Sequence, residues 1–153
     1  GTENVPALAG LGAAVTACRL GLLDTSVRVA RLRDRLEQGV LASVPETVVN
    51  GDRTRRAPHT TNISFGGVDG ESLMIALDLE GVAVSPGSAC TSGSLAPSHV
   101  LEAMGFPPSR VQSALRFSLG WATTDDDIDR VLGLLPTVVD RLRAAAPARA
   151  ETR

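Results

Sequence analysis

One cysteine, Cys90, lies in the middle of the segment Ser85–Ser94, which reads SPGSACTSGS. Almost all of its residues are small, so they cannot bury enough area to hold the segment firmly, and we predict a mobile loop. A thiol on such a loop is accessible and suits nucleophilic chemistry. The alternative is a cysteine that is merely tolerated at the surface. Because free cysteines are usually buried, we favour a chemical role for Cys90.

Arg116 is the second candidate, because it lies in a segment of alternating apolar and polar residues. Leu115, Phe117 and Leu119 alternate with Arg116 and Ser118, and this period of two predicts a strand with one face in the core and the arginine on the polar face. The planar guanidinium donates two parallel hydrogen bonds to a carboxylate, as an amino-acid-binding site requires. Solvation at the surface of an edge strand is the alternative for Arg116.

Three further residues are weaker candidates. His99 lies nine positions after Cys90 and is a conceivable base, but a histidine in the first turn of a helix is more often just partly exposed. His59 adjoins an arginine-rich stretch and has less support. Cys18 lies in an apolar helical segment and is expected in the core. The arginines of the stretch 52–59 are expected to be solvated, as charge runs in loops usually are.

Composition excludes several classes of function. The chain has 153 residues, enough for one domain, and its formal net charge of −2 provides no basic field for nucleic acid. All 15 cationic residues are arginine, so no lysine of this chain can form a Schiff base. Its two cysteines, Cys18 and Cys90, have no neighbours at zinc spacing. A disulfide scaffold is not indicated either, which favours the reducing cytoplasm.

Two further observations concern membrane insertion and the start of the chain. No uninterrupted apolar run approaches the roughly 18 to 20 residues of a membrane span, so we expect a soluble protein. The first residues, Gly1-Thr2-Glu3-Asn4, have no initiating Met and no basic segment typical of a signal peptide. We therefore expect a fragment or a processed chain.

The elements that must position these residues can be predicted from periodicity. Pro6–Leu22 is apolar on nearly every side and predicts a helix buried all round. Asp24-Thr25-Ser26 are capping residues, followed by an amphipathic helix over Val27–Leu41. The remaining predicted elements are strands at 47–49, 60–65, 82–84 and 115–119, helices at 70–79 and 97–104, a short turn at 107–108, and a C-terminal helix from a Thr123 or Thr124 cap to about Leu142. The fold class is α/β, a small sheet packed with helices.

The segment around Cys90 resembles a known family. Ser85–Gly93 looks like the active-cysteine loop of the pyridoxal-phosphate-dependent cysteine desulfurases, within the class V aminotransferase family. It is joined, in family order, by Gly1–Pro6, Asn62–Phe65, Gly70–Leu73 and Leu115–Gly120. The resemblance runs to about Leu142 and is greatest to the nitrogen-fixation and iron–sulfur-cluster branch. Only the C-terminal portion of that family is present.

The resemblance implies roles for three residues. Cys90 matches the nucleophile that takes sulfur from L-cysteine, leaving L-alanine and an enzyme persulfide. Arg116 matches the arginine that holds the substrate carboxylate. Thr2 matches the threonine that reaches the cofactor phosphate of the partner subunit in a homodimer. The lysine that binds pyridoxal 5'-phosphate covalently, and the histidine and aspartate that contact the cofactor, would all precede Gly1.

By the same resemblance, residues 1–22 belong to the end of the large cofactor-binding domain. Residues 23–145 form the small C-terminal domain of a fold type I transferase, with the active-cysteine loop at 85–94, and 146–153 form a disordered tail. The implied partners are L-cysteine, the upstream large domain, a second subunit and a sulfur-acceptor protein, with no membrane and no direct nucleic acid. The sulfur destination stays open between iron–sulfur clusters, transfer-RNA thiolation and DNA modification. The alternative function is a cofactor-free sulfur-relay or interaction domain that carries a persulfide on Cys90.

Overall fold

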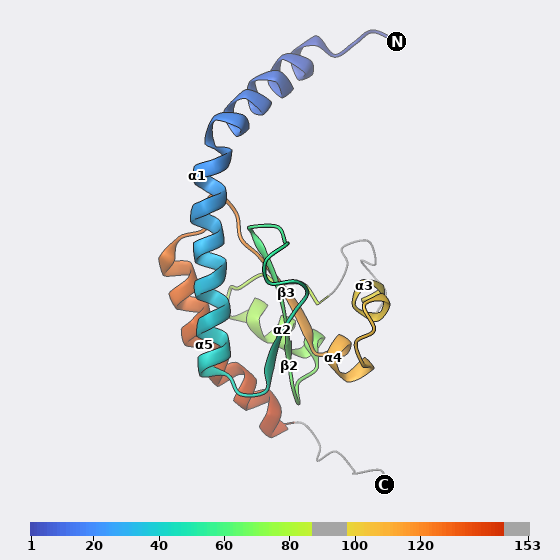
Figure 1. Cartoon of the computed structure of the whole chain (residues 1–153), viewed down its shortest axis with the longest axis vertical. Coiled ribbons are helices and arrows are strands. Elements are labelled where there is room, and N and C mark those ends of the chain that lie inside the picture. Colours follow the sequence, from blue (N-terminus) through green and yellow to red (C-terminus); the bar gives the residue numbers. More distant parts are fainter. Residues whose placement is uncertain (87–97, 146–153) are drawn as a thin grey trace.

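The computed structural model describes residues 1–86 and 98–145. These residues form a small three-stranded sheet with helices around it, and a long first helix that extends beyond the rest of the chain (Figure 1). In chain order the elements are α1 (Val5–Ser43), β1 (Thr47–Asn50), β2 (Thr60–Phe65), α2 (Gly70–Leu79), α3 (His99–Ala103), α4 (Pro108–Gln112), β3 (Ala114–Ser118) and α5 (Asp125–Ala145).

The first helix is continuous where the sequence predicts two helices. Asn4 caps α1, its side chain accepting a hydrogen bond from the Ala7 amide at 3.1 Å. The predicted break at residues 24–26 is wrong. Asp, Thr and Ser disfavour a helix interior only slightly, and no proline follows them, so the backbone hydrogen bonds continue through this point.

The second half of α1 packs as its periodicity predicts. Val29, Leu32, Leu36 and Val40 are buried at helical spacing and join the main core. In Figure 1, α5 runs beside this half of α1, and the sheet lies on the opposite side of α1. The second half of α1 therefore shares the main core with α5 and the sheet.

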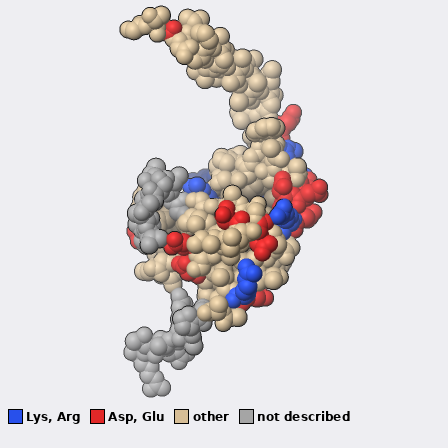
Figure 2. Space-filling view, turned by 180° about the vertical axis from the view of Figure 1, so that it is seen from behind, with Lys and Arg blue, Asp and Glu red and all other residues tan. Residues whose placement is uncertain are grey.

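The first half of α1 is exposed within this chain, so the expected burial of this helix and of Cys18 would have to come from the upstream domain. Val5, Leu11 and Leu20 are 66%, 60% and 80% exposed, and Cys18 is also exposed. Neither the helix nor Cys18 lies in a core, because no other described element of this chain packs on this half. Figure 2 shows it as a nearly uncharged rod, whereas acidic and basic side chains gather over the rest of the molecule.

The same helix also corrects the hydropathy expectation. An 18-residue window of α1 has a mean hydropathy of 1.5 and is 0% buried, so α1 is long and apolar enough to cross a membrane. Helices of soluble proteins pass the same test, so length and composition alone do not assign α1 to a membrane.

The sheet is antiparallel, in the order β1-β2-β3. Ile63, Phe65, Leu115 and Phe117 point to the core side, which α1, α2 and α5 cover. The opposite face carries polar residues, as the alternation around Arg116 predicts. The strand predicted at 82–84 is absent. The only pairing of this segment with β3 among the described residues is an isolated bridge between Ser85 and Arg116.

The connection between β1 and β2 is held to α1 by a buried ion pair. Glu37 is 2% exposed and accepts hydrogen bonds from Arg56 Nη2 at 2.8 Å and from the Thr61 hydroxyl at 2.5 Å. Burial raises the pKa of the Glu37 carboxyl. The hydrogen bonds from Arg56 and Thr61 and the charges of Arg56 and Arg33 outweigh burial, so this pKa lies below its ordinary value. The expectation of a solvated arginine is therefore wrong for Arg56.

We expect Glu37→Gln to lower the free energy of unfolding by about 3 kcal/mol at pH 7, because it removes the buried carboxylate paired with Arg56 and leaves only the half-exposed Asp34, at 3.4 Å, as a counter-charge. A carboxyl whose pKa falls on folding stabilises the protein above its unfolded pKa, and this contribution is lost as the pH falls through the folded value. The difference in the free energy of unfolding between wild type and variant should therefore become smaller under acid conditions. Thermal unfolding of the protein, followed by circular dichroism at pH 7 and at acid pH, measures this.

Arg55→Gln is the matched control, since the Arg55 side chain in the same connection is 90% exposed. It should unfold at the wild-type temperature. A Glu37→Gln protein as stable as this control would show that the ion pair adds nothing.

Candidate functional site

The candidate site is centred on Arg116, in the middle of β3. Its amide donates to the Ser85 carbonyl at 2.6 Å, and the Ser85 amide donates to the Arg116 carbonyl at 3.2 Å. Arg116 is half-buried, and its Nε atom is buried without a hydrogen-bond partner among the described residues. Burying a donor of a charged group without an acceptor is costly. The arginine is therefore suited to an anionic ligand.

The bridge to Ser85 also fixes where the predicted active-cysteine loop begins. Cys90 itself lies outside the described residues, so the structure neither tests its role nor the predicted mobility of 85–94. What the structure describes is the start of this segment, where Ser85 is paired directly with Arg116.

A polar network covers the sheet face next to Arg116. Asn62 on β2 is the register partner of Arg116, and Asn50 on β1 is the partner of Asn62. Asn50 Nδ2 donates to Asn62 Oδ1 at 2.6 Å and to the Ser64 hydroxyl at 2.8 Å. Arg110 Nε donates to Asn50 Oδ1 at 2.7 Å.

This network was not predicted from the sequence. Asn50 suggests an Asn-Gly turn, and Arg110 follows the two prolines of a short turn, so neither points to a site. Arg110 is also stacked on Phe106, with its guanidinium carbon 4.0 Å from the ring centroid. The missing information is the register of β1 on β2, which pairs residues 50 and 62, and the packing of α4 beside β2, which adds Arg110.

Thr2 is not brought near Arg116. It is exposed and precedes α1, at the end of the helix that points away from the sheet (Figure 1). A helix of 39 residues rises about 58 Å at 1.5 Å per residue. The role of Thr2 in cofactor binding therefore stays a prediction, and the resemblance places that role on the partner subunit's cofactor.

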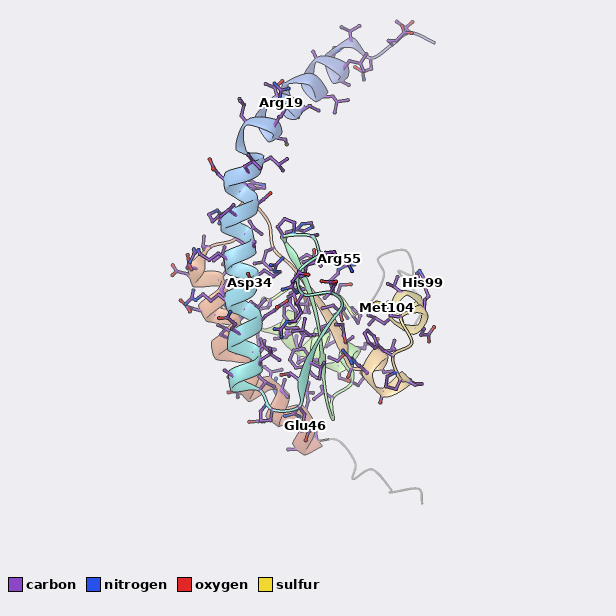
Figure 3. All side chains as sticks on the ribbon, in the orientation of Figure 1. Arg19, Asp34, Glu46, Arg55, His99 and Met104 are labelled. Atoms are coloured by element: carbon purple, nitrogen blue, oxygen red, sulfur yellow. The ribbon has the colours of Figure 1, made fainter. Side chains whose placement is uncertain are left out.

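The two histidines contribute little to this site. His99 is exposed at the start of α3 and points away from the sheet (Figure 3). The His59 carbonyl accepts a hydrogen bond from the Leu119 amide at 2.8 Å, which joins the start of β2 to the end of β3. Neither makes a described contact with Arg116. The alternative role of His99 as a base for Cys90 stays untested, because Cys90 lies outside the described residues.

Comparisons with known proteins agree with this geometry. A family model described as aminotransferase class-V matches residues 1–131. A cysteine desulfurase from a Nostoc species is 50% identical over 147 residues, covering 96% of this chain and 37% of that protein. The cysteine desulfurase NifS of Azotobacter vinelandii is 44% identical over 147 residues, with the same coverage. The chain thus spans little more than a third of the length of these relatives.

Solved structures give the same result. A NifS-like protein aligns with a TM-score of 0.79 at 26% identity, covering 93% of this chain and 35% of the other. A NifS-like protein from Rickettsia africae aligns with a TM-score of 0.76 at 30% identity, covering 92% and 36%. The expected small sheet packed with helices, part of a larger fold type I transferase, is confirmed. The division into domains at residue 22 stays a prediction. From the family match and these relatives, the chain belongs to the class V aminotransferase family, and it matches the cysteine desulfurases within it.

Proposed function

We propose that this chain is the C-terminal part of a cysteine desulfurase. The complete enzyme removes sulfur from L-cysteine, releases L-alanine and keeps the sulfur as a persulfide on Cys90. The observation that carries this proposal is the backbone pairing of Ser85 with Arg116. It starts the cysteine-bearing segment beside a half-buried arginine whose Nε has no described partner. The names of the relatives support the same activity.

The two residues divide the chemistry between them. Arg116 binds the carboxylate of the substrate and so orients the amino acid. The thiolate of Cys90 attacks the substrate sulfur, forming a sulfur–sulfur bond as the carbon–sulfur bond breaks. The electron pair of that bond stays on the substrate β-carbon, which takes up a proton to become the methyl group of alanine. One thiol and one cysteine thus give one persulfide and one alanine, with no external oxidant.

The reaction also requires an electron sink, which pyridoxal 5'-phosphate supplies when bound. The residues of this chain fit only part of such a site. Arg116 offers a cation for the substrate carboxylate, but the sequence has no lysine for covalent attachment. We propose that the attaching lysine lies on the upstream large domain, and that Thr2 contacts the phosphate held by the partner subunit of a homodimer.

The exposed first half of α1 supports this assembly. It presents apolar residues such as Leu8 and Leu11 that no described element of the chain covers, and a large exposed apolar surface marks an interaction site. The large domain of the same enzyme is the occupant we propose for residues 1–22. We further propose a cytoplasmic enzyme, bound to neither membrane nor nucleic acid. It passes its sulfur to an acceptor protein for iron–sulfur cluster assembly, in keeping with the NifS relatives.

Incubating the full-length enzyme with L-cysteine and a reductant tests the activity. We expect a yellow protein that forms alanine and sulfide in equal amounts. L-serine, which carries a hydroxyl in place of the thiol, is the matched control substrate and should release no alanine. A colourless protein that takes up sulfur only from a separate persulfide donor would instead establish the sulfur-relay alternative.

A further inference from the structure

We infer that Asn62 supplies a second hydrogen-bond donor, beside Arg116, for the carboxylate of the amino-acid substrate, and that Arg110 and Asn50 hold its amide in the donating orientation. The inference rests on the proposed function, since it concerns the same substrate. It adds a binding residue on β2 and a chain of positioning residues on β1 and α4.

The orientation of the Asn50 amide is determined by Arg110. A guanidinium group has only donors, so whichever atom of Asn50 faces Arg110 Nε must be an acceptor. The separation of 2.7 Å therefore assigns Oδ1 of Asn50 to this contact. Arg110 is itself held by stacking on Phe106 and by a hydrogen bond of 3.3 Å from Nη2 to the Val49 carbonyl.

The orientation of the Asn62 amide follows from the same logic. With Oδ1 of Asn50 occupied, its Nδ2 donates, and it reaches Asn62 at 2.6 Å and the Ser64 hydroxyl at 2.8 Å. Ser64 accepts this bond and donates its own proton to the Arg110 carbonyl at 2.7 Å, which closes the network consistently. Asn62 must therefore accept through Oδ1, and its Nδ2 points away from Asn50.

That leaves an amide donor of known orientation on the residue directly opposite Arg116 in the sheet. Asn62 Nδ2 donates to no described residue, and the Arg116 Nε has no described partner either. The two residues are directly opposite on neighbouring strands, where β-carbons lie about 5 Å apart. Two adjacent groups that only donate fit a ligand that only accepts. A carboxylate has two oxygen atoms and can accept one hydrogen bond from each of these two residues.

Variants of the full-length enzyme separate this role from a structural one. Asn62→Asp keeps the oxygen that accepts from Asn50 but replaces the free donor with an anionic oxygen beside Arg116. We expect it to raise KM for L-cysteine at least about tenfold, with kcat changed much less, because a contact to an unreacting carboxylate contributes equally to substrate and transition state. Asn62→Ala, which removes donor and acceptor together, should also raise KM about tenfold.

Two competitors identify the group that is recognised. 3-Mercaptopropionate has the carboxylate and thiol without the amine, and cysteamine has the amine and thiol without the carboxylate. Asn62→Asp should weaken inhibition by 3-mercaptopropionate about tenfold and leave cysteamine within about twofold. Val48→Asp is the matched control. It places a carboxylate on the same sheet face, at an exposed position of β1 that pairs with Ser64, away from Arg116.

The outcomes are distinct. Loss of affinity confined to carboxylate ligands supports the inference. An equal loss for both competitors, or values for both Asn62 variants that match Val48→Asp, would overturn it. If Arg116→Lys also bound 3-mercaptopropionate as well as wild type, the proposed carboxylate site itself would fail. A retained effect of Arg116 with no effect of Asn62 would reject only the present inference.

Discussion

Cys90→Ser is expected to abolish persulfide formation in the full-length enzyme, lowering the rate of alanine release from L-cysteine by at least about a thousandfold. A hydroxyl is a far weaker nucleophile than a thiolate, because it is almost wholly protonated at neutral pH. The cofactor absorbance should be unchanged, since this residue is proposed to act on the substrate sulfur and not to hold the cofactor. Mass spectrometry of peptides after one turnover measures the added sulfur atom directly.

Cys18→Ala is the matched control, because it removes the other cysteine of the chain. Cys18 lies in the half of α1 assigned to the large-domain contact, remote from β3 along the helix. Its variant should form persulfide on Cys90 at the wild-type rate. Persulfide found on Cys18, or alanine still formed by Cys90→Ser, would contradict the assignment of the nucleophile.

The sequence predicts local structure well where one period dominates. The bounds of β2 and α2 are confirmed, and β1 and β3 lie within a residue or two of their predicted positions. The burial of Leu32 and Leu36 follows from helical spacing in the same way. These elements each have one face in the core, so apolar periodicity carries the information directly.

The failures have a different physical origin. The burial expected for the all-round apolar helix is not among the failures, because the upstream domain that we expect to cover it is outside this chain. Capping residues at 24–26 were expected to end a helix, but local propensities there are too weak to do so. C-terminal helix α5 extends to Ala145, past the predicted end near Leu142, since alanine favours helix and nothing in 143–145 breaks it.

The candidate site was predictable only in part. Alternation in one strand is enough to place Arg116 on the polar face. Its bridge to Ser85 and the network of Asn50, Asn62 and Arg110 depend on pairing between residues far apart in sequence. No local pattern encodes such a register. The resemblance to a family supplied the role of Arg116, and the structure supplied its neighbours.

Arg116→Lys is the second change with a large expected effect. Lysine keeps the positive charge but loses the planar fork that donates two parallel hydrogen bonds to a carboxylate. We expect KM for L-cysteine to rise about thirtyfold, and Arg116→Ala, which also loses the charge, to raise it further, about a hundredfold or more. Steady-state kinetics with the full-length enzyme give both values. Inhibition by cysteamine should stay near the wild-type value in both variants, because that competitor has no carboxylate.

The control for this series is Arg130→Lys on α5, where the side chain donates to the Glu80 carbonyl at an exposed position. It makes the same chemical change away from β3 and should leave KM within about twofold of wild type. The order wild type, Arg116→Lys, Arg116→Ala tests geometry and charge separately, since a site that used charge alone would tolerate lysine. If all three bound L-cysteine equally, Arg116 would be an ordinary polar-face residue. The buried Nε without a described partner would then need another ligand to explain it.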